Sequence, residues 1–163
     1  MSDFASTEQR LAVTCRRYPD FPRHPATLVR LVKHIHKLVH DEANTMLKPY
    51  GINHPEYNLM MMLYGTASGT MSPSELADAA GEKSANITRL TNELCDKGLI
   101  ARSASADDRR RVELSLTAQG LALIDSFLPD ICGMLLRQTR HLTDSEQAQF
   151  EKLLKKLLGG LAD

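Results

Sequence analysis

The feature that most constrains the fold of this chain is a pair of short predicted helices, joined by a glycine turn, within residues 72–98. Ser72, Pro73 and Glu75 have the spacing of a capping box with proline at the first helical position, so a helix is predicted to begin there. Gly81 ends that helix, and the second helix begins two or three residues later. Two helices separated by such a short turn predict a helix-turn-helix.

Two short predicted strands follow the second helix. Residues 99–102 are mostly apolar, and residues 112–116 alternate between apolar and polar, which is typical of strands. The segment between them, residues 103–111, is polar and charged and ends in three arginines. A helix-turn-helix followed by a hairpin with a basic tip predicts a winged helix over about residues 72–117.

The rest of the chain predicts helices on both sides of this motif. Apolar residues at three- and four-residue steps predict an amphipathic helix over residues 26–47. Three prolines in the first 25 residues predict an extended arm before it, and Cys15 falls in this arm. Further helices are predicted over residues 54–66, which should be buried all round, 118–141, and 143–158, which two glycines should end.

These elements predict a mostly α fold with a small β-hairpin wing, formally α+β. At 163 residues with 42% apolar residues, the chain is long enough for one domain with a real core, residues 1–163. Its three parts are an arm with the first helix, the winged helix-turn-helix lobe and the C-terminal helices, residues 1–50, 54–117 and 118–163 respectively.

The charge distribution favours nucleic acid as a partner although the net charge is zero, with 20 basic and 20 acidic residues. Residues 51–82 contain no Lys or Arg and four acidic residues, whereas residues 83–111 contain seven basic and four acidic residues. The basic excess therefore coincides with the second helix and the wing, where a DNA-binding protein needs positive charge for the phosphates.

The second helix of the motif has the side chains needed to read base edges in the major groove. Ile87 and Leu90 are predicted to face the core, which leaves the polar residues outward. Arg pairs with guanine and Asn with adenine through two hydrogen bonds, while a wing arginine fits the narrow minor groove. The predicted DNA-binding residues are Ser84, Asn86, Thr88, Arg89, Asp108, Arg109, Arg110 and Arg111.

Several of these stretches together resemble the MarR family of bacterial repressors. They are Lys97-Gly98-Leu99-Ile100, Asp108-Arg109-Arg110, and Leu114-Ser115-Leu116-Thr117 followed by Gly120. The segments Tyr18–Pro22 and Pro73–Leu76 are most similar to the branch that represses multidrug efflux operons. The resemblance implies that Arg110 enters the minor groove and that Asp108 holds it in place.

The resemblance also implies a homodimer on a palindromic operator, regulated by a small aromatic or lipophilic effector. Dimerisation would use the first and last helices, through Leu28, Leu31, Ile35, Phe150, Leu154 and Leu157. The effector would bind in a cleft between the dimerisation helices and the DNA-binding lobe, and would release DNA by changing the spacing of the lobes. Its predicted ligand-binding residues are Met60, Met61 and His34, although methionines on an apolar helix are more often core residues.

Three alternatives remain open from the sequence. One is a redox-responsive regulator that uses Cys15, which lies beside two arginines. His36 and His40 have the spacing of a helical metal pair, but no further ligand completes a site. A winged helix used only as a protein-interaction module is the third.

Other classes of function are disfavoured. The chain has none of the nucleophile, phosphate-loop or metalloprotease motifs of common enzymes, so we expect no enzymatic activity, no cofactor and no metal. Its three cysteines form no pair with metal-ligand spacing, which favours a reducing compartment. The longest apolar run, residues 59–64, is too short to cross a membrane, so we expect a cytoplasmic protein without membrane contact.

Overall fold

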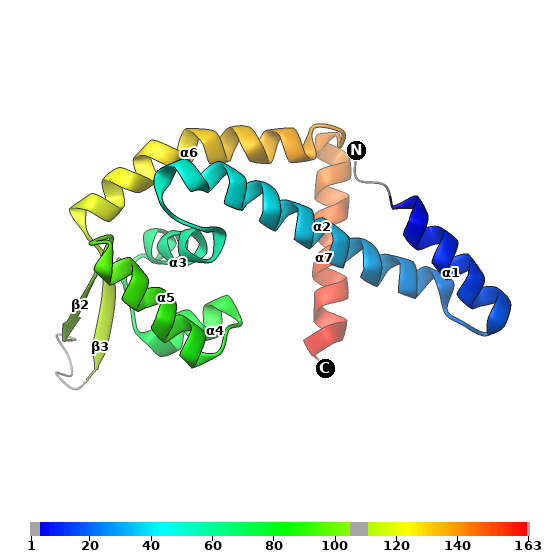
Figure 1. Ribbon diagram of the computed structural model, residues 1–163, viewed down its shortest axis with the longest axis horizontal. Helices are drawn as coiled ribbons and strands as arrows, with labels where there is room; N and C mark the ends of the chain where they lie inside the picture. The colour runs from blue at the N-terminus through cyan, green and yellow to red at the C-terminus, as the bar shows by residue number, and fades with distance from the viewer. Residues whose placement is uncertain (1–3, 105–110, 163) are drawn as a thin grey trace. The chain divides into compact units, whose positions relative to one another are not determined.

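The computed structural model describes residues 4–104 and 111–162 (Figure 1). The chain divides into two compact units, Met1–His54 and Pro55–Asp163. The described residues are mostly helical with one small antiparallel sheet, which confirms the predicted fold class.

The first unit is built on two helices that contact each other, α1 (Ala5–Arg17) and α2 (Arg23–Leu47), and a 3-10 turn, η1 (Lys48–Tyr50). The prediction of an extended arm was therefore wrong for α1. Residues 5–17 contain no proline and consist largely of residues that tolerate a helix, and Leu11 is buried in the unit. Cys15 consequently lies in the last turns of α1, where it is half-buried.

The prolines that suggested an arm have a more local effect. Pro19 lies in the turn between the two helices, and Pro22 is the residue that precedes the first turn of α2. Pro25 is inside that first turn, where the backbone N–H groups have no partner within the helix, so proline costs no hydrogen bond there. The helix therefore begins at Arg23, three residues before the predicted start.

The second unit contains the helix-turn-helix, the wing and the C-terminal helices. In chain order its elements are α3 (His54–Gly65), β1 (Thr70–Met71), α4 (Pro73–Ala80), α5 (Ser84–Asp96), β2 (Ile100–Ala104), β3 (Val112–Leu116), α6 (Ala118–Thr139) and α7 (Asp144–Ala162). The two predicted strands and the paired short helices are confirmed to within two residues at their ends.

The sheet has three strands in the order β1-β3-β2, all antiparallel. The hairpin register pairs Ile100 with Leu116 and Ala104 with Val112. Strand β1, which pairs Thr70 with Ser115, was not predicted, because two residues are too few to show a periodic pattern. β1 pairs with the edge of β3 that β2 leaves free, so β3 is the central strand and β1 and β2 are the two edge strands.

The core of the second unit is formed by apolar side chains from its helices and strands. Helix α5 contributes Ile87, Leu90 and Leu94, all at most 2% exposed, which confirms the predicted inner face of this helix. Helix α3 is buried on one side only, and Tyr64 on its other side is 45% exposed, so the prediction that it is buried all round was wrong. The other fully buried residues include Leu59, Met60, Leu63, Leu76, Leu114, Ile124 and Phe127.

Helices α6 and α7 differ in what covers them. Helix α6 continues through Pro129 and is long and apolar enough to cross a membrane by length and composition, the one such helix among the described residues. However, five of its residues at three- and four-residue steps are buried in the protein: Gly120, Ile124, Phe127, Ile131 and Met134. In α7 every described side chain is solvent-exposed, and the helix continues through Gly159 and Gly160, which were predicted to end it.

Candidate nucleic-acid interface

The turn between α4 and α5 fixes how the second helix is presented. At its start, α4 has the predicted capping box: the Ser72 hydroxyl accepts from the Glu75 N–H at 3.3 Å, and the Glu75 carboxylate accepts from the Ser72 N–H at 2.6 Å. Hydrogen bonds from the Ser72 backbone N–H and side chain to the carboxylate hold the pKa of the Glu75 carboxyl below its usual value. At its end, Gly81 adopts a left-handed conformation with φ 62°, which favours glycine and lets the chain turn directly into α5.

Helix α5 presents a polar face opposite its buried one. Ser84, Thr88 and Arg89 are exposed and Asn86 is half-buried, so all four predicted residues of this helix reach its surface. No side chain caps the helix at Lys83, which leaves its first N–H groups open to an anion such as a phosphate. The face has the donors and acceptors that base edges require.

The structure adds two acidic residues to this face that sequence reasoning missed. Glu82 accepts a hydrogen bond from the Asn86 amide at 2.9 Å, and Glu93 forms an ion pair with Arg89 at 2.6 Å. Arg89 also donates to the Asn86 side-chain oxygen at 2.9 Å. Since the Arg89–Glu93 pair is largely exposed, breaking it costs only about 0.2–1 kcal/mol. Arg89 is therefore held in place without DNA but can exchange its partners at low cost.

Arg102, on strand β2, connects the wing to α5. One of its guanidinium nitrogens, Nη2, donates to Asn92 Oδ1 at 2.7 Å and to Thr91 Oγ1 at 3.0 Å. Because Thr91 is buried and Asn92 is exposed, the guanidinium contacts α5 where the buried face of the helix meets its exposed face. The sequence marked Arg102 only as part of the basic excess, because the contact depends on the packing of β2 against α5.

The base of the wing is closed by the residues of the Leu-Thr-x-x-Gly motif. The Thr117 hydroxyl donates to the Gly98 carbonyl at 2.7 Å and accepts from the Gly120 N–H at 3.0 Å, so it caps α6. A Cβ on Gly120 would lie 2.1 Å from the Leu99 carbonyl oxygen. The motif therefore needs a hydroxyl at Thr117 and no side chain at Gly120, because the start of α6 contacts the turn between α5 and β2.

The C-terminal end of α5 is attached to α3. Lys97 Nζ lies 2.7 Å from Glu56 Oε1, and the Glu56 side chain is 1% exposed while that of Lys97 is 40% exposed. A buried carboxylate is stable in a protein only when it is paired and hydrogen-bonded. This ion pair thus fixes the C-terminal end of α5 against α3.

The tip of the wing is only partly described. Arg111 is exposed, and its charge also contributes to the lowered pKa of Glu75 on α4. Asp108, Arg109 and Arg110 lie outside the described residues. The described part of the wing is the antiparallel pair of β2 and β3, which extends to the pairing of Ala104 with Val112.

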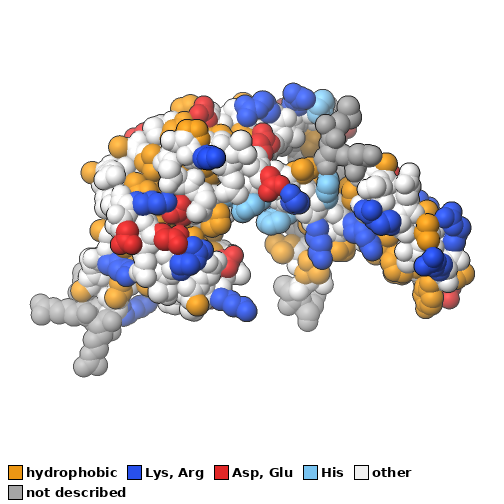
Figure 2. Space-filling view, viewed as in Figure 1, with side chains coloured by type: hydrophobic (Ala, Val, Ile, Leu, Met, Phe, Trp, Pro, Cys, Tyr) orange, Lys and Arg blue, Asp and Glu red, His pale blue; other side chains and the backbone are white. Residues whose placement is uncertain are grey.

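Figure 2 shows basic and acidic side chains interspersed over the second unit and basic side chains gathered over α1 and α2. The predicted effector residues are distributed over both units. Met60 is fully buried in the core and Met61 half-buried, while His34 is half-buried in the first unit. Effector binding by these residues stays a prediction.

The predicted dimerisation residues are apolar and mostly exposed in the single chain. Leu28, Ile35 and Phe150 are 44–56% exposed, and Leu31 is half-buried. Leu154 and Leu157 on α7 are 39% and 38% exposed. Dimerisation through these residues stays a prediction.

Three histidines of the first unit, His36, His40 and His54, lie together. His40 and His54 are joined by a hydrogen bond of 3.0 Å between their Nδ1 atoms, and His36 stacks on His40. Within residues 4–104 and 111–162, no group of three or more His, Cys, Asp or Glu side chains is arranged to hold a metal ion. A response of Cys15 to redox conditions likewise stays a prediction.

Comparison with known proteins agrees with this geometry. A family model described as MarR family matches residues 52–112. The transcriptional repressor MprA of Escherichia coli strain K12 is 34% identical over 160 residues, which cover 98% of this chain and 91% of the relative. The HTH-type transcriptional regulator PrsX of Escherichia coli is 34% identical over 145 residues, which cover 89% of this chain and 87% of the relative.

Among solved structures, the chain resembles a mutant of MarR from Escherichia coli in complex with operator DNA. The TM-score is 0.76 at 25% sequence identity, and the match covers 85% of this chain and 99% of that one. The curated relatives are transcription regulators and not enzymes.

Proposed function

The chain belongs to the MarR family of DNA-binding transcription regulators, and on that premise we propose that it is a homodimeric repressor of an efflux or stress-response operon. A small aromatic or lipophilic effector releases it from a palindromic operator in the cytoplasm. The observation that carries the proposal is the exposed polar face of α5, next to a wing whose strand β2 is hydrogen-bonded to the same helix through Arg102 and Asn92.

In this proposal α5 enters the major groove and the wing enters the adjacent minor groove. Ser84, Asn86, Thr88 and Arg89 contact base edges and nearby phosphates, and their exposure on one helix face supports this role. Arg110 enters the minor groove, positioned by Asp108, and Arg109 and Arg111 contact the backbone. The solved complex of MarR with operator DNA, which this chain resembles over most of its length, supports the arrangement.

Dimerisation uses the apolar faces of α2 and α7. Leu28 and Ile35 on α2, and Phe150, Leu154 and Leu157 on α7, are too exposed in the single chain for a stable soluble surface. A second copy of the chain that covers both faces would give two recognition helices related by a twofold axis. Such a dimer fits half-sites about 34 Å apart.

The repressor role is supported by the relatives named as transcriptional repressors, and the class of effector by the resemblance of the Tyr18–Pro22 segment to the efflux branch of the family. The effector would contact His34, Met60 and Met61. Because Met60 is fully buried, its contact with the effector requires the core around α3 to open.

The deciding experiment selects bound sequences from a random DNA pool and measures affinity for the selected site at fixed salt. Arg89→Ala is expected to change which sequences are selected, and Arg110→Ala to weaken binding by about tenfold or more without changing the selected sequence. Arg16→Ala, which removes an exposed charge from α1, is the matched control and should leave both properties unchanged. If the wild-type protein enriches no sequence, the proposal of sequence-specific DNA binding is wrong. A protein-interaction module then becomes the better explanation of the winged helix.

A further inference from the structure

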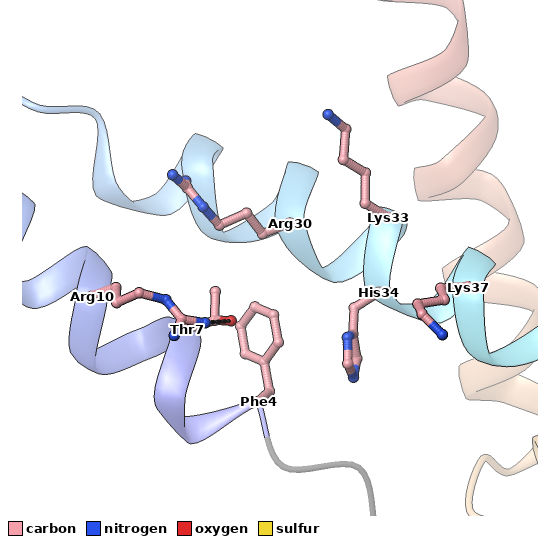
Figure 3. Close-up of a pocket in the computed structure, with 7 residues that line it drawn as sticks. All are labelled: Phe4, Thr7, Arg10, Arg30, Lys33, His34 and Lys37. Carbon is pink, nitrogen blue, oxygen red and sulfur yellow. Dashed lines mark hydrogen bonds between the residues drawn. The ribbon is translucent and has the colours of Figure 1, made fainter.

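A pocket in the first unit is lined mainly by basic side chains. It lies between α1 and α2, has a volume of about 330 Å³, and is therefore within the size range of small-molecule sites (Figure 3). Four of its lining residues are cationic: Arg10 from α1, and Arg30, Lys33 and Lys37 from α2. No acidic residue belongs to the described lining.

The sequence of α2 produces this concentration of charge. Residues 23–40 contain four basic residues and no acidic one. Arg30, Lys33 and Lys37 are spaced by three and four residues, so they lie on one face of the helix. That face lines the pocket opposite α1.

Most of these charges have no ion-pair partner among residues 4–104 and 111–162. Lys37 forms an ion pair with Asp41. Arg10, in contrast, donates to the neutral hydroxyls of Ser6 and Thr7, and Arg30 donates to the Ala26 carbonyl. Among the described residues, Arg10, Arg30 and Lys33 therefore keep their positive charge around one cavity. Like charges held around one cavity repel each other, and a bound anion removes that repulsion.

The remaining lining residues add a polar and an aromatic wall. The Thr7 hydroxyl belongs to the lining and is held by Arg10 at 3.2 Å. Phe4 and His34 are in tilted ring contact with centroids 5.9 Å apart, and in Figure 3 the Phe4 ring lies between His34 and the Arg10 guanidinium. Guanidinium groups bind carboxylate and phosphate oxygens through paired hydrogen bonds, which ammonium groups support as point charges.

We propose that this pocket is a binding site for a small multivalent anion that carries phosphate or carboxylate groups. The proposal goes beyond the proposed function, because such an anion differs in chemistry from an aromatic or lipophilic effector. The proposed site is formed by residues of the first unit alone, and Arg10 and Arg30 line it from two different helices.

The test is calorimetric titration of the full-length protein with pyrophosphate and, separately, with citrate, at constant ionic strength. We expect saturable binding of at least one of them, with one site per chain. Arg10→Gln/Arg30→Gln should weaken that binding at least about tenfold, because it removes a guanidinium from each wall of the pocket. Arg16→Gln/Arg17→Gln removes the same charge from the exposed end of α1 and should leave affinity within about twofold.

Lys33→Gln provides a second variant that cannot disturb a hydrogen bond within the described residues, and it should also weaken binding. Binding of pyrophosphate without citrate, or the reverse, supports the site and identifies the group that it prefers. Absence of saturable binding of both anions overturns the proposal, as does an equal loss of affinity in the two double variants. Helix content measured by circular dichroism checks that each variant is folded.

Discussion

Arg102 of the wing donates a hydrogen bond to Asn92 of the recognition helix, with Nη2 at 2.7 Å from Oδ1. Strand β2 and helix α5 carry the two surfaces that contact DNA in our proposal. This hydrogen bond helps to hold the two surfaces in one relative orientation before DNA is bound, which lowers the conformational entropy that binding must remove.

Arg102→Ala is expected to lower affinity for the operator about three- to tenfold, equivalent to roughly 0.7–1.4 kcal/mol. The reason is the loss of orientation between β2 and α5 rather than the loss of a phosphate contact. Fluorescence anisotropy at several salt concentrations measures it. Arg102→Lys keeps the charge but not the guanidinium geometry, so it should remain defective. Full affinity in the lysine variant would contradict the positioning role.

Gly120→Ala is expected to lower the free energy of unfolding by about 1–3 kcal/mol or more, because the new Cβ would meet the Leu99 carbonyl oxygen at 2.1 Å, and backbone cannot move aside easily. Gly133→Ala, in the same helix, is the control. Its Cβ would meet only the flexible end of Arg137 at 3.5 Å, and alanine in a helix interior gains about 0.5–1 kcal/mol over glycine. Urea unfolding at equal protomer concentration compares them, and equal effects of the two changes would refute the close contact.

Lys97→Met is expected to destabilise the protein by about 1–3 kcal/mol, because it removes the ammonium group that lies 2.7 Å from the buried Glu56 carboxylate. The double variant Glu56→Gln/Lys97→Met removes the buried negative charge as well as the cation. We therefore expect it to be more stable than the single variant Lys97→Met. A double-mutant cycle from urea unfolding gives the coupling energy. A coupling energy near zero would show that the ion pair contributes nothing.

The capping box predicts a pH-dependent contribution from Glu75. Hydrogen bonds from Ser72 lower the pKa of this carboxyl in the folded state below the ordinary 4.5, so its stabilising contribution is present above that pH and is lost as the pH falls through the folded-state pKa. Glu75→Gln should therefore be less stable than wild type near neutral pH, and the difference should shrink between about pH 5 and pH 3. A difference that stays constant over this range, measured by urea unfolding, contradicts the assignment.

His54 predicts a loss of stability in mild acid. Burial first, and then the nearby His40 and His36, lower the pKa of His54 below the ordinary 6.5. The unfolded chain then binds more protons than the folded one, so the free energy of unfolding falls as the pH drops below about 6.5. His54→Gln should reduce this slope, whereas His24→Gln, at an exposed position, should not. An unchanged slope in the His54 variant would rule out this histidine as its source.

The local elements were predictable because each is marked by residues close in sequence. Ser72 and Glu75 mark the start of α4, Gly81 its end, and Thr117 the start of α6, and the structure confirms all of these caps. Two of the errors arose because one residue type is compatible with more than one local structure. Proline was taken as a helix breaker in the first 25 residues, although Pro25 lies inside the first turn of α2. The glycines at 159 and 160 were taken as a stop, although α7 tolerates them.

The candidate site was predictable in its outline but not in its partners. The exposure of Ser84, Thr88 and Arg89 follows from helical periodicity once Ile87 and Leu90 face the core. The restraint of Arg89 by Glu93 lies within one helix turn and could have been found from the i,i+4 spacing. In contrast, no spacing rule predicts that Arg102 reaches Asn92, or that Lys97 reaches Glu56.

Local sequence patterns were enough to predict the order of the elements, the buried face of α5 and the membership of a DNA-binding family, because caps, periodicity and motifs act over a few residues. The hydrogen bond between the wing and α5, and the set of charges around the pocket between α1 and α2, could be found only in the folded chain. These features bring together side chains that are distant along the chain or on different helices, and their distances depend on how the intervening elements pack, which no local pattern encodes.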